Sequence, residues 1–550
     1  MNKLCEIFSS VQDGETVLLD NRVYDVYQDD CFVLNRYYCS NTASKEENPD
    51  GTRFVAMYLK DKNNITIDGK GATIKVHGVM TPMLFDGCKN ITVKNLTIDY
   101  ARPTMSEFRI VKRDKGVVEI DIPKEFLFDV EDTTLVWKGE TGKDGKPYWQ
   151  HSYKGKDVLS MFYDEVAERV RLCDYDEGDT RPSVPTFTKI ERLSQNRLRV
   201  YLANENAYFP EGNVVQTRNI VRNQVGSFFV HCKNLTLQNV RVCAMHGLGL
   251  LCQYCENVTY DKLDCTPKQG RTIVSNADFF HFSGCKGMVE IKNCKAWGAH
   301  DDFINVHGTH LRIIEQDKDN KRITVRFIHS QTWGFDAFSV GDEIEYVRHD
   351  TLIPYAKATV VETKRLNDTD ILLTLSQVLP TEIELGKDVV ENASNTPSVH
   401  IHDSYFGVSA GRGVLCTTRG SVRIENNVFY HTAGAPLVIE DDCNFWFESG
   451  YTTDVQFIGN KIIGCGYGFK GNGGPLIQVT PQVLNRNSAH HVHGKLTIKK
   501  NVFEEQNKAG YFFQFEYIDA VWISGNVFDA PYRIEEYNVG NIYLHNNLER

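Results

Sequence analysis

The 550-residue sequence predicts an all-β fold: a right-handed parallel β-helix, which is a solenoid of stacked coils, with two small antiparallel β-sheet or barrel subdomains inserted into it. Three observations predict this fold. A short strand motif recurs along the chain, asparagine and glycine stand at the ends of its copies, and two long stretches lack it. A single coil cannot bury its apolar face alone, so coils with two or three short strands stack to form a continuous core.

The repeated motif is a corner residue followed by a short strand of alternating apolar and polar residues. Cys88–Val93 recurs as Cys232–Leu237 and Cys255–Tyr260, and steps of 23 to 30 residues suit one turn of such a helix. Apolar side chains at every second position predict strands with one face toward an interior. Asparagine and glycine tolerate the left-handed backbone needed at a corner, which explains why they bound the copies. Further copies are Asn64–Ile67, Cys285–Glu290, Val422–Asn427, Leu496–Asn501 and Val521–Asn526.

Two long stretches lack the repeated motif and instead carry charged strands joined by short polar turns. Val117–Ile120 is typical of the first stretch and Ile371–Leu375 of the second. Such patterns indicate small antiparallel sheets or barrels. The second stretch begins soon after His307, so we expect it to wall in a pocket beside the aspartates described below. The predicted domains are N-terminal coils 1–101, an insertion 102–222, central coils 223–310 with the aspartate site, an insertion 311–395 and C-terminal coils 396–550.

Composition and charge argue against several classes of partner. The net charge of −11 and the isoelectric point near 5.9 disfavour nucleic acid and anionic membranes, and they suit a neutral substrate. No apolar run approaches the roughly 20 residues that span a bilayer. The first residues lack a secretory signal, which favours a cytoplasmic protein over a secreted or periplasmic one whose signal was removed. The flat flanks and edges of a solenoid also permit a homodimer.

The cysteines and the apparent glycosylation sequons have structural interpretations. The 15 cysteines are odd in number and several recur at equivalent repeat positions, so we expect buried free thiols rather than a disulfide scaffold. The CxxC pair Cys252 and Cys255 has no second pair beside it and is interpreted in the same way. The sequons that begin at Asn64, Asn90, Asn234 and Asn257 are interpreted as corners of the solenoid.

Three aspartates are the candidate catalytic residues: Asp278, Asp301 and Asp302. Asp301 follows Asp278 by 23 residues, about one coil, and equivalent positions in neighbouring coils lie about 4.8 Å apart. Neighbouring residues on a regular strand point to opposite faces, so Asp301 and Asp302 must lie at a bend or bulge for both to face outward. Mutual repulsion would keep one carboxyl protonated. Three carboxylates across two coils can supply an acid and a base about 6.5–9.5 Å apart, the separation that an inverting glycosidase requires.

These residues carry a resemblance. Asn276-Ala277-Asp278, Asp301-Asp302 and His307-Gly308 resemble the site of polygalacturonase-type β-helix hydrolases, which show Asn-x-Asp, then Asp-Asp about one coil later, then Gly-His-Gly. The chain more closely resembles glycoside hydrolase family 110, the exo-acting α-1,3-galactosidases. That closer resemblance includes the 23-residue step, Ile98–Pro103 ahead of the first insertion, and Trp446–Gly450 in a late coil.

The resemblance implies an activity and roles for the aspartates. It implies removal of terminal, non-reducing α-1,3-linked galactose, from branched blood-group-B-like or linear Gal-α-1,3-Gal glycans, with inversion and without metal or cofactor. Asp301 would be the general acid, and Asp278 and Asp302 would position and deprotonate the attacking water. Val306 replaces the first glycine of Gly-His-Gly. The Arg-Ile-Lys motif that grips uronate has no clear copy, since Arg423–Glu425 ends in Glu, and this favours a neutral sugar.

Five further residues are candidates for substrate binding. His307 would bond a sugar hydroxyl or orient Asp301, or else simply cap a turn. Trp446 and Glu448 would supply a sugar platform and a hydroxyl acceptor, and the alternative for Trp446 is packing on the solenoid wall. Arg412 and Glu440 belong to neighbouring late coils and are weaker candidates.

Other functions remain open at this point. A polygalacturonase-like or other β-helix glycan hydrolase would use the same aspartates. In a calcium-dependent polysaccharide lyase the aspartates would hold the ion, but no lysine lies in the aspartate motifs to abstract a proton. A non-catalytic glycan-binding solenoid would need neither clustered carboxylates nor inserted walls.

Overall fold

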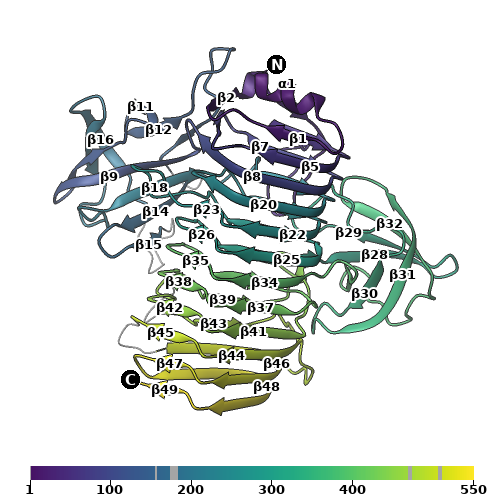
Figure 1. Ribbon diagram of the computed structural model, residues 1–550. Coiled ribbons are helices and arrows are strands. Elements are labelled where there is room, and N and C mark those ends of the chain that lie inside the picture. Colours follow the sequence, from purple (N-terminus) through teal and green to yellow (C-terminus); the bar gives the residue numbers. More distant parts are fainter. Residues whose placement is uncertain (1, 155–157, 174–183, 469–473, 506–510) are drawn as a thin grey trace.

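The computed structural model describes residues 2–154, 158–173, 184–468, 474–505 and 511–550. The predicted parallel β-helix is confirmed: its coils stack from the N-terminus to the C-terminus, with one insertion on each side (Figure 1). The single α-helix of the described part, α1 (Lys3–Ser10), lies at the N-terminal end and buries Leu4, Cys5 and Phe8 against the first coils. None of the described helices has the length and apolar character that a membrane crossing requires.

The coils arrange their strands in three columns of parallel pairs. The first column holds the repeated motif, and its strands are β5 (Asn63–Asp68), β8 (Lys89–Tyr100), β20 (Lys233–Val242), β22 (Glu256–Asp261), β25 (Lys286–Lys292), β34 (Ser398–His402), β37 (Val422–Glu425), β41 (Asp454–Ile458) and β44 (His493–Lys499). The second column is β23 (Asp264–Cys265), β26 (Lys295–Ala296), β35 (Tyr405–Phe406), β38 (Val428–Tyr430), β42 (Lys461–Ile463), β45 (Val502–Glu504), β47 (Val527–Phe528) and β49 (Leu548–Glu549).

The third column positions the site. Its strands are β4 (Arg53–Lys60), β7 (Thr81–Asp86), β19 (Ser227–Val230), β21 (Leu250–Gln253), β24 (Phe280–Ser283), β27 (Ile304–Thr309), β36 (Val414–Cys416), β39 (Leu437–Ile439) and β43 (Ile477–Val479). The last coils end in long strands, β46 (Tyr511–Ser524) and β48 (Tyr532–His545), which pair along their length.

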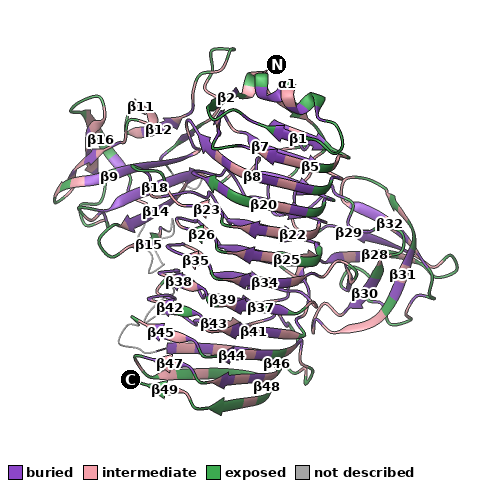
Figure 2. Cartoon of the chain, in the orientation of Figure 1, coloured by how far each residue is buried: buried purple, intermediate pink, exposed green. Residues whose placement is uncertain are grey.

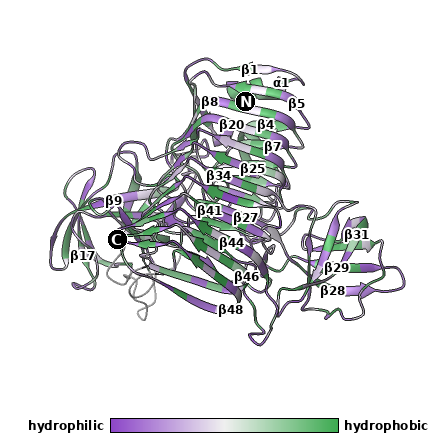
Figure 3. Cartoon of the chain, turned by 60° about the horizontal axis from the view of Figure 1, so that its bottom comes forward, coloured by the Kyte–Doolittle hydropathy of each residue, from purple (hydrophilic) through white to green (hydrophobic). Residues whose placement is uncertain are grey.

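One continuous apolar core fills the solenoid. The alternation predicted from the motif is visible in β8, where Ile91 and Val93 point inward and are buried while Asn90 is exposed. Figure 2 shows the same alternation of buried and exposed residues along the coils, and Figure 3 shows it as alternating hydropathy. All 15 cysteines are free thiols and only Cys31 is not fully buried, as the sequence predicted.

The corner asparagines form a ladder along the outside of the first column. Asn64, Asn90, Asn234 and Asn257 have φ values of 57–58°, the left-handed conformation expected at a corner. Their carboxamides bond from coil to coil, Asn90 to Asn64 at 2.8 Å and Asn257 to Asn234 at 2.9 Å. The structure therefore gives these asparagines the corner role predicted from the repeat.

The two insertions are antiparallel. The first has a seven-stranded sheet of β9 (Met105–Asp114), β10 (Val117–Asp121), β14 (Val158–Asp164), β15 (Arg169–Leu172), β16 (Phe187–Arg192), β17 (Arg197–Leu202) and β18 (Val214–Asn219), and a small sheet of β11 (Leu127–Glu131), β12 (Thr134–Lys138) and β13 (Gln150–Ser152). The second is a closed barrel of β28 (Leu311–Asp317), β29 (Arg322–Arg326), β30 (Glu343–Val347), β31 (Pro354–Arg365), β32 (Asp370–Leu375) and β33 (Val389–Asn392). These strands fall inside the predicted insertions, and the division into five domains stays a prediction.

A second, buried asparagine ladder runs through the C-terminal coils, from Asn427 through Asn460, Asn501 and Asn526 to Asn547. Asn460 accepts from the backbone N–H of Asn427 at 2.9 Å and donates to the carbonyl of Ile424 at 2.9 Å. The same two bonds recur one coil later at Asn501. The ladder thus satisfies backbone groups at each turn that would otherwise be buried without partners.

We expect Asn460→Ala to destabilise the solenoid because it leaves several buried polar groups unpaired, each costing roughly 1–3 kcal/mol. Thermal unfolding followed by circular dichroism should show Tm lowered by about 2 °C or more. Gln456→Ala, on the outer face of the same coil, is the matched control and should leave Tm unchanged. An unchanged Tm for both variants would contradict a structural role for the ladder.

Candidate active site

The candidate site lies where the chain turns into the third column. Phe280 pairs with Ile304 and Ile304 with Val414, so the residues two positions earlier, Asp278, Asp302 and Arg412, are equivalent in three successive coils. The structural step from Asp278 is therefore 24 residues, to Asp302, with Asp301 standing beside the stack. The register of the solenoid brings two acidic side chains and one basic side chain to the same place.

The backbone bends at the aspartate pair, as predicted. Asp301 lies in a bend and Asp302 in irregular chain before β27, and both line one cavity. The carbonyl of Asp301 accepts from Ser409 Oγ at 2.7 Å, which holds the bend to the next coil. A Cβ at Gly411 would stand 2.5 Å from the carbonyl carbon of Asp301, so glycine is required for this close approach.

Asp302 is held in an ion pair with Arg412. Arg412 Nε lies 2.9 and 3.0 Å from the two oxygens of Asp302, Nη2 lies 2.7 Å from Oδ2, and the backbone N–H of Arg412 donates to Oδ1 at 2.7 Å. Asp302 is only 1% exposed. A buried carboxylate that accepts this many hydrogen bonds from one arginine forms a charge-assisted ion pair with it. Such an ion pair favours the ionised form of the carboxyl group.

The other two aspartates are driven toward their protonated forms. One oxygen of each of the three carboxyl groups lies within 4.8 Å of the others, closer than the 6.5–9.5 Å expected for an inverting acid and base. Burial, followed by the charge of Asp302, raises the pKa of Asp278 to about 8 and that of Asp301 to about 7. The cluster therefore holds one charged carboxylate and two carboxyls that keep protons near neutral pH.

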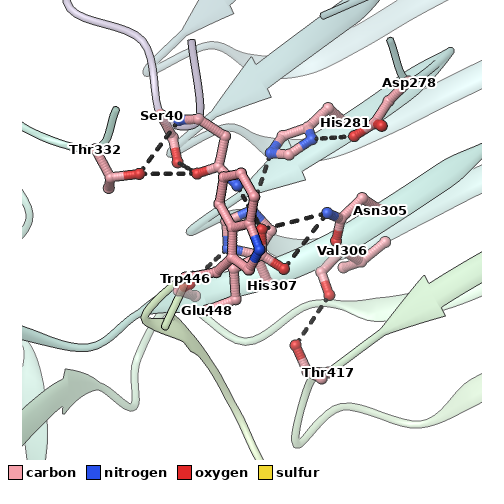
Figure 4. A network of polar contacts seen from close by, with 12 residues as sticks. Ser40, Asp278, His281, Asn305, Val306, His307, Thr332, Thr417, Trp446 and Glu448 are labelled. Atoms are coloured by element: carbon pink, nitrogen blue, oxygen red, sulfur yellow. Dashed lines mark hydrogen bonds and ion pairs between the residues drawn. The ribbon is translucent and has the colours of Figure 1, made fainter. Parts of the chain in front are cut away.

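A chain of two histidines extends from Asp278 (Figure 4). His281 Nδ1 lies 2.8 Å from Asp278 Oδ2, His281 Nε2 lies 2.9 Å from His307 Nε2, and His307 Nδ1 lies 2.6 Å from the carbonyl of Gly308. Since a carbonyl only accepts, His307 donates from Nδ1, and its Nε2 accepts from His281 Nε2. His281 Nδ1 is left as an acceptor, so the carboxyl of Asp278 is the donor.

The pKa shifts of His281 and Asp278 favour a proton on the carboxyl rather than on the imidazole. Burial, with the neighbouring His307 as the second cause, lowers the pKa of His281 to about 3, while the pKa of Asp278 is raised. His281 is neutral and Asp278 protonated in such a pair. The hydrogen bond to His281 thus occupies the proton of Asp278 and leaves Asp301 as the protonated carboxyl that faces the cavity.

His307 does not line the cavity. It is 3% exposed, contacts His281, and its Nε2 lies 3.8 Å from Glu448 Oε1. The sequence left open whether His307 binds a sugar hydroxyl, orients Asp301 or caps a turn. The structure instead places it behind His281, where it acts on Asp278 and only indirectly on the cavity.

The other predicted binding residues line the cavity. Trp446 is 45% exposed and its ring lies against His329, with centroids 4.3 Å apart. Glu448 accepts from Asn41 and lies 3.5 Å from Asn305 Nδ2, and Glu440 accepts from Gln482 at 2.7 Å and lies 3.6 Å from Arg412. Trp446 therefore stands exposed at the cavity instead of packing into the solenoid wall.

The second insertion supports the outer wall, as expected from its position in the sequence. Thr332 Oγ1 donates to Asn41 Oδ1 at 2.9 Å, and Arg222 Nη2 donates to Gln331 Oε1 at 2.7 Å. His329 from the same segment packs against Trp446. Three residues of the barrel thus hold three residues of the cavity wall, which encloses about 560 Å³ of space including its open mouth.

Several lining residues were missed by sequence reasoning. Asn41 lies in the loop between β3 (Phe32–Leu34) and β4, and Arg222 lies where the first insertion ends. Neither segment carries the repeat that revealed the aspartates. His281 had a signal, since it follows Asp278 by three residues and lies on the strand that begins two residues after Asp278. The missed residues of the cavity are Asn41, Arg222, Leu248, His281, Asn305, Leu415, Thr417 and Asp442.

One interpretation from the sequence is wrong. Arg423–Glu425 lies in β37 of the first column, where Glu425 accepts from His400 Nε2 at 2.8 Å and pairs with Arg423 at 2.7 Å. It does not line the cavity, so the glutamate there says nothing about a uronate.

Two groups in the described part of the chain have the side chains that a cation would need. One is the aspartate cluster, whose oxygens suit calcium, and the other is Glu290 with His400 and His402 on the first column. In the aspartate cluster, the guanidinium of Arg412 already lies against both oxygens of Asp302. Arginine therefore supplies the positive charge that a cation would otherwise bring.

Comparison with known proteins gives the family. Residues 322–390 match the family model described as GLAA-B beta-barrel domain II. The chain is 34% identical over 487 residues to alpha-1,3-galactosidase A of Bacteroides fragilis, which covers 87% of this chain and 76% of that protein. Alpha-1,3-galactosidase A of Akkermansia muciniphila is also 34% identical, over 88% of this chain and 76% of that protein.

More distant likenesses span nearly the whole chain. Alpha-1,3-galactosidase B of Bacteroides thetaiotaomicron is 28% identical over 94% of this chain and 80% of that protein. Among solved structures, an exopolygalacturonase from Thermotoga maritima is similar at 12% identity and a TM-score of 0.33, covering 98% of this chain and 95% of that one. With relatives at 34% identity matched over most of both chains, the protein belongs to the α-1,3-galactosidase family.

Proposed function

We propose that the protein is an exo-acting glycosidase that removes terminal, non-reducing α-1,3-linked galactose with inversion and without a metal ion. The observation that carries the proposal is the ion pair of Asp302 with Arg412, which leaves Asp301 as a protonated carboxyl in the cavity. The names of the relatives, all α-1,3-galactosidases, support the substrate.

Asp301 is the general acid in this proposal. Its side chain has no hydrogen-bond partner among the described residues, and its raised pKa keeps it protonated near neutral pH. A general acid must hold a proton and be free to give it to the leaving oxygen. Asp278 also holds a proton, but the contact with His281 turns that proton away from the cavity.

Asp302 is the base, and Asp278 helps to position the attacking water. Both oxygens of Asp302 accept from Arg412, which disfavours their use as the nucleophile of a retaining mechanism and suits a charged base. The backbone N–H of Asp302 lies 3.3 Å from Asp278 Oδ1, so the two carboxyl groups are fixed relative to each other. Because the three carboxyl groups are close, the water lies beside the cluster rather than between acid and base.

The cavity suits a neutral terminal sugar. Six carboxyl groups and two arginines line it, and this excess of acids repels a uronate. Trp446 offers an exposed aromatic face for the apolar side of a sugar ring, and Glu448 and Asn305 offer hydrogen-bonding groups to hydroxyls. The wall held by the barrel favours a chain end over the middle of a polymer, which is the basis for exo action.

A calcium-dependent lyase is the alternative hypothesis for the function of the aspartate cluster. A lyase needs a lysine or arginine free to abstract a proton. No lysine lines the cavity among the described residues, Arg412 is committed to Asp302, and Arg222 donates to Gln331. The lining therefore favours hydrolysis.

We expect proton NMR of a Gal-α-1,3-Gal substrate to show β-galactose as the first product, because inversion converts the α-linkage to the β-anomer. The rate should be the same with and without a chelator. First release of α-galactose would refute inversion, and chelator-sensitive unsaturated products would replace the hydrolase with a lyase.

The rate of galactose release should depend on the protonated form of Asp301. The raised pKa of about 7 keeps this form present below neutral pH, so kcat/KM should fall with increasing pH above about 7, approaching tenfold per unit. Asp301→Asn should lower kcat about a thousandfold at unchanged Tm, whereas Asp454→Asn on the outer face of β41 should keep full activity. A rate that is flat from pH 6 to 9, or an active Asp301→Asn enzyme, contradicts this role.

A further inference from the structure

A second cavity adjoins the candidate active site and no step of the proposed reaction uses it. It encloses about 770 Å³ including its mouth, between the first insertion and the N-terminal and central coils. Arg222 lines both cavities. Asn276 lines the second cavity and Asp278, two residues on, lines the first, so the same chain segment forms part of both walls.

Three buried side chains that line this second cavity carry polar atoms without partners. Both ring nitrogens of His151, both ring nitrogens of His246 and Oδ1 of Asn276 have no hydrogen-bond partner among the described residues. These side chains are 7%, 1% and 2% exposed. Buried polar atoms are nearly always paired in folded proteins, because leaving them unpaired is costly. A ligand with hydroxyl groups would supply the missing partners.

The two histidines are fixed by ring contacts. His246 lies flat against Tyr100, with ring centroids 4.1 Å apart, and His151 lies against Trp149 at 5.5 Å. Burial lowers the pKa of His151 to about 4 and that of His246 to about 3, so both rings are neutral. A neutral imidazole offers one donor and one acceptor, the same combination that a sugar hydroxyl can complete.

The rest of the lining is nearly uncharged and mixes polar side chains with the apolar Phe54, Val79 and Val221. Among the described residues, six carboxamide side chains line the cavity together with Tyr148 and Trp149, and Arg222 is the one charged side chain. Trp149 is half-buried and Gln150 is exposed at the rim. This chemistry differs from the acidic active-site cavity and fits a neutral, hydroxylated ring that stacks on an aromatic face.

We propose that this cavity is a second carbohydrate subsite, which binds a neutral sugar residue of the leaving group through His151, His246 and Asn276. Trp149 supplies the stacking surface. The inference rests on the proposed function, since the sugar that enters is the part of the glycan left after galactose departs. It also locates substrate selection in the first insertion: glycans that fill this subsite would be preferred to simple galactosides.

The test compares two substrates in the full-length protein. α-Galactosyl fluoride has no sugar in its leaving group, and a neutral oligosaccharide with a terminal α-1,3-galactose has several. We expect the ratio of kcat/KM for the oligosaccharide to that for the fluoride to fall about tenfold or more in Trp149→Ala, and likewise in Gln150→Trp, which obstructs the exposed rim. Trp522→Ala removes a tryptophan that stacks on Tyr543 on the outer solenoid, and it should leave the ratio unchanged.

The outcomes separate this inference from the proposed function. A ratio that stays within about twofold of wild type in Trp149→Ala and Gln150→Trp overturns the subsite. If the wild-type protein hydrolyses neither substrate, the proposed function fails, and calorimetric titration with the galactose-free oligosaccharide then decides. Binding by wild type that weakens about tenfold in Trp149→Ala would support the subsite. Absent binding, or equal binding by both proteins, means that the cavity holds only water.

Discussion

The ion pair between Asp302 and Arg412 is the interaction on which the rest of the site depends. The register of the third column stacks Asp278, Asp302 and Arg412 in three successive coils, so the arginine meets one aspartate and not the other. Asp302 is thereby held as the charged member of the cluster. Its charge, added to burial, raises the pKa of Asp278 and Asp301, and the three carboxyl groups acquire different roles from one shared position.

The solenoid and its insertions make separate contributions. The coils fix the spacing of the aspartates through backbone pairing, which leaves little freedom for the cluster to rearrange. The barrel holds Asn41, Arg222 and Trp446 through His329, Gln331 and Thr332, and so converts an outward face of the solenoid into a cavity. The first insertion forms the neighbouring cavity in a corresponding way, with Trp149 and His151 opposite the coils.

Much of the fold was predictable because the solenoid repeats. Corner residues such as Asn90 and Asn234 mark the turns in the sequence. The same periodicity predicted that Asp278 lies close to Asp301 and Asp302, as the structure shows. The bend at the aspartate pair followed from strand geometry alone. These features depend on local spacing, which a single sequence displays directly.

The rest of the site depends on contacts between distant segments, which carry no periodic signal. Arg222 and Asn41 reach the cavity from the end of an insertion and from an irregular loop. His307 was expected near Asp301 but contacts His281, because it lies two residues along β27 from Asn305, which is the register partner of His281. Arg423–Glu425 was compared with a substrate-binding strand from its sequence alone. In the structure it lies in the first column of strands, away from the cavity.

The central claim is that Asp302 is charged while Asp278 and Asp301 hold protons. Neutron diffraction from crystals exchanged into heavy water below neutral pH measures this directly. The account predicts deuterium on Asp301, deuterium between Asp278 Oδ2 and His281 Nδ1 that belongs to the carboxyl, and none on either oxygen of Asp302. Deuterium on Asp302, or a bare Asp301, would contradict it.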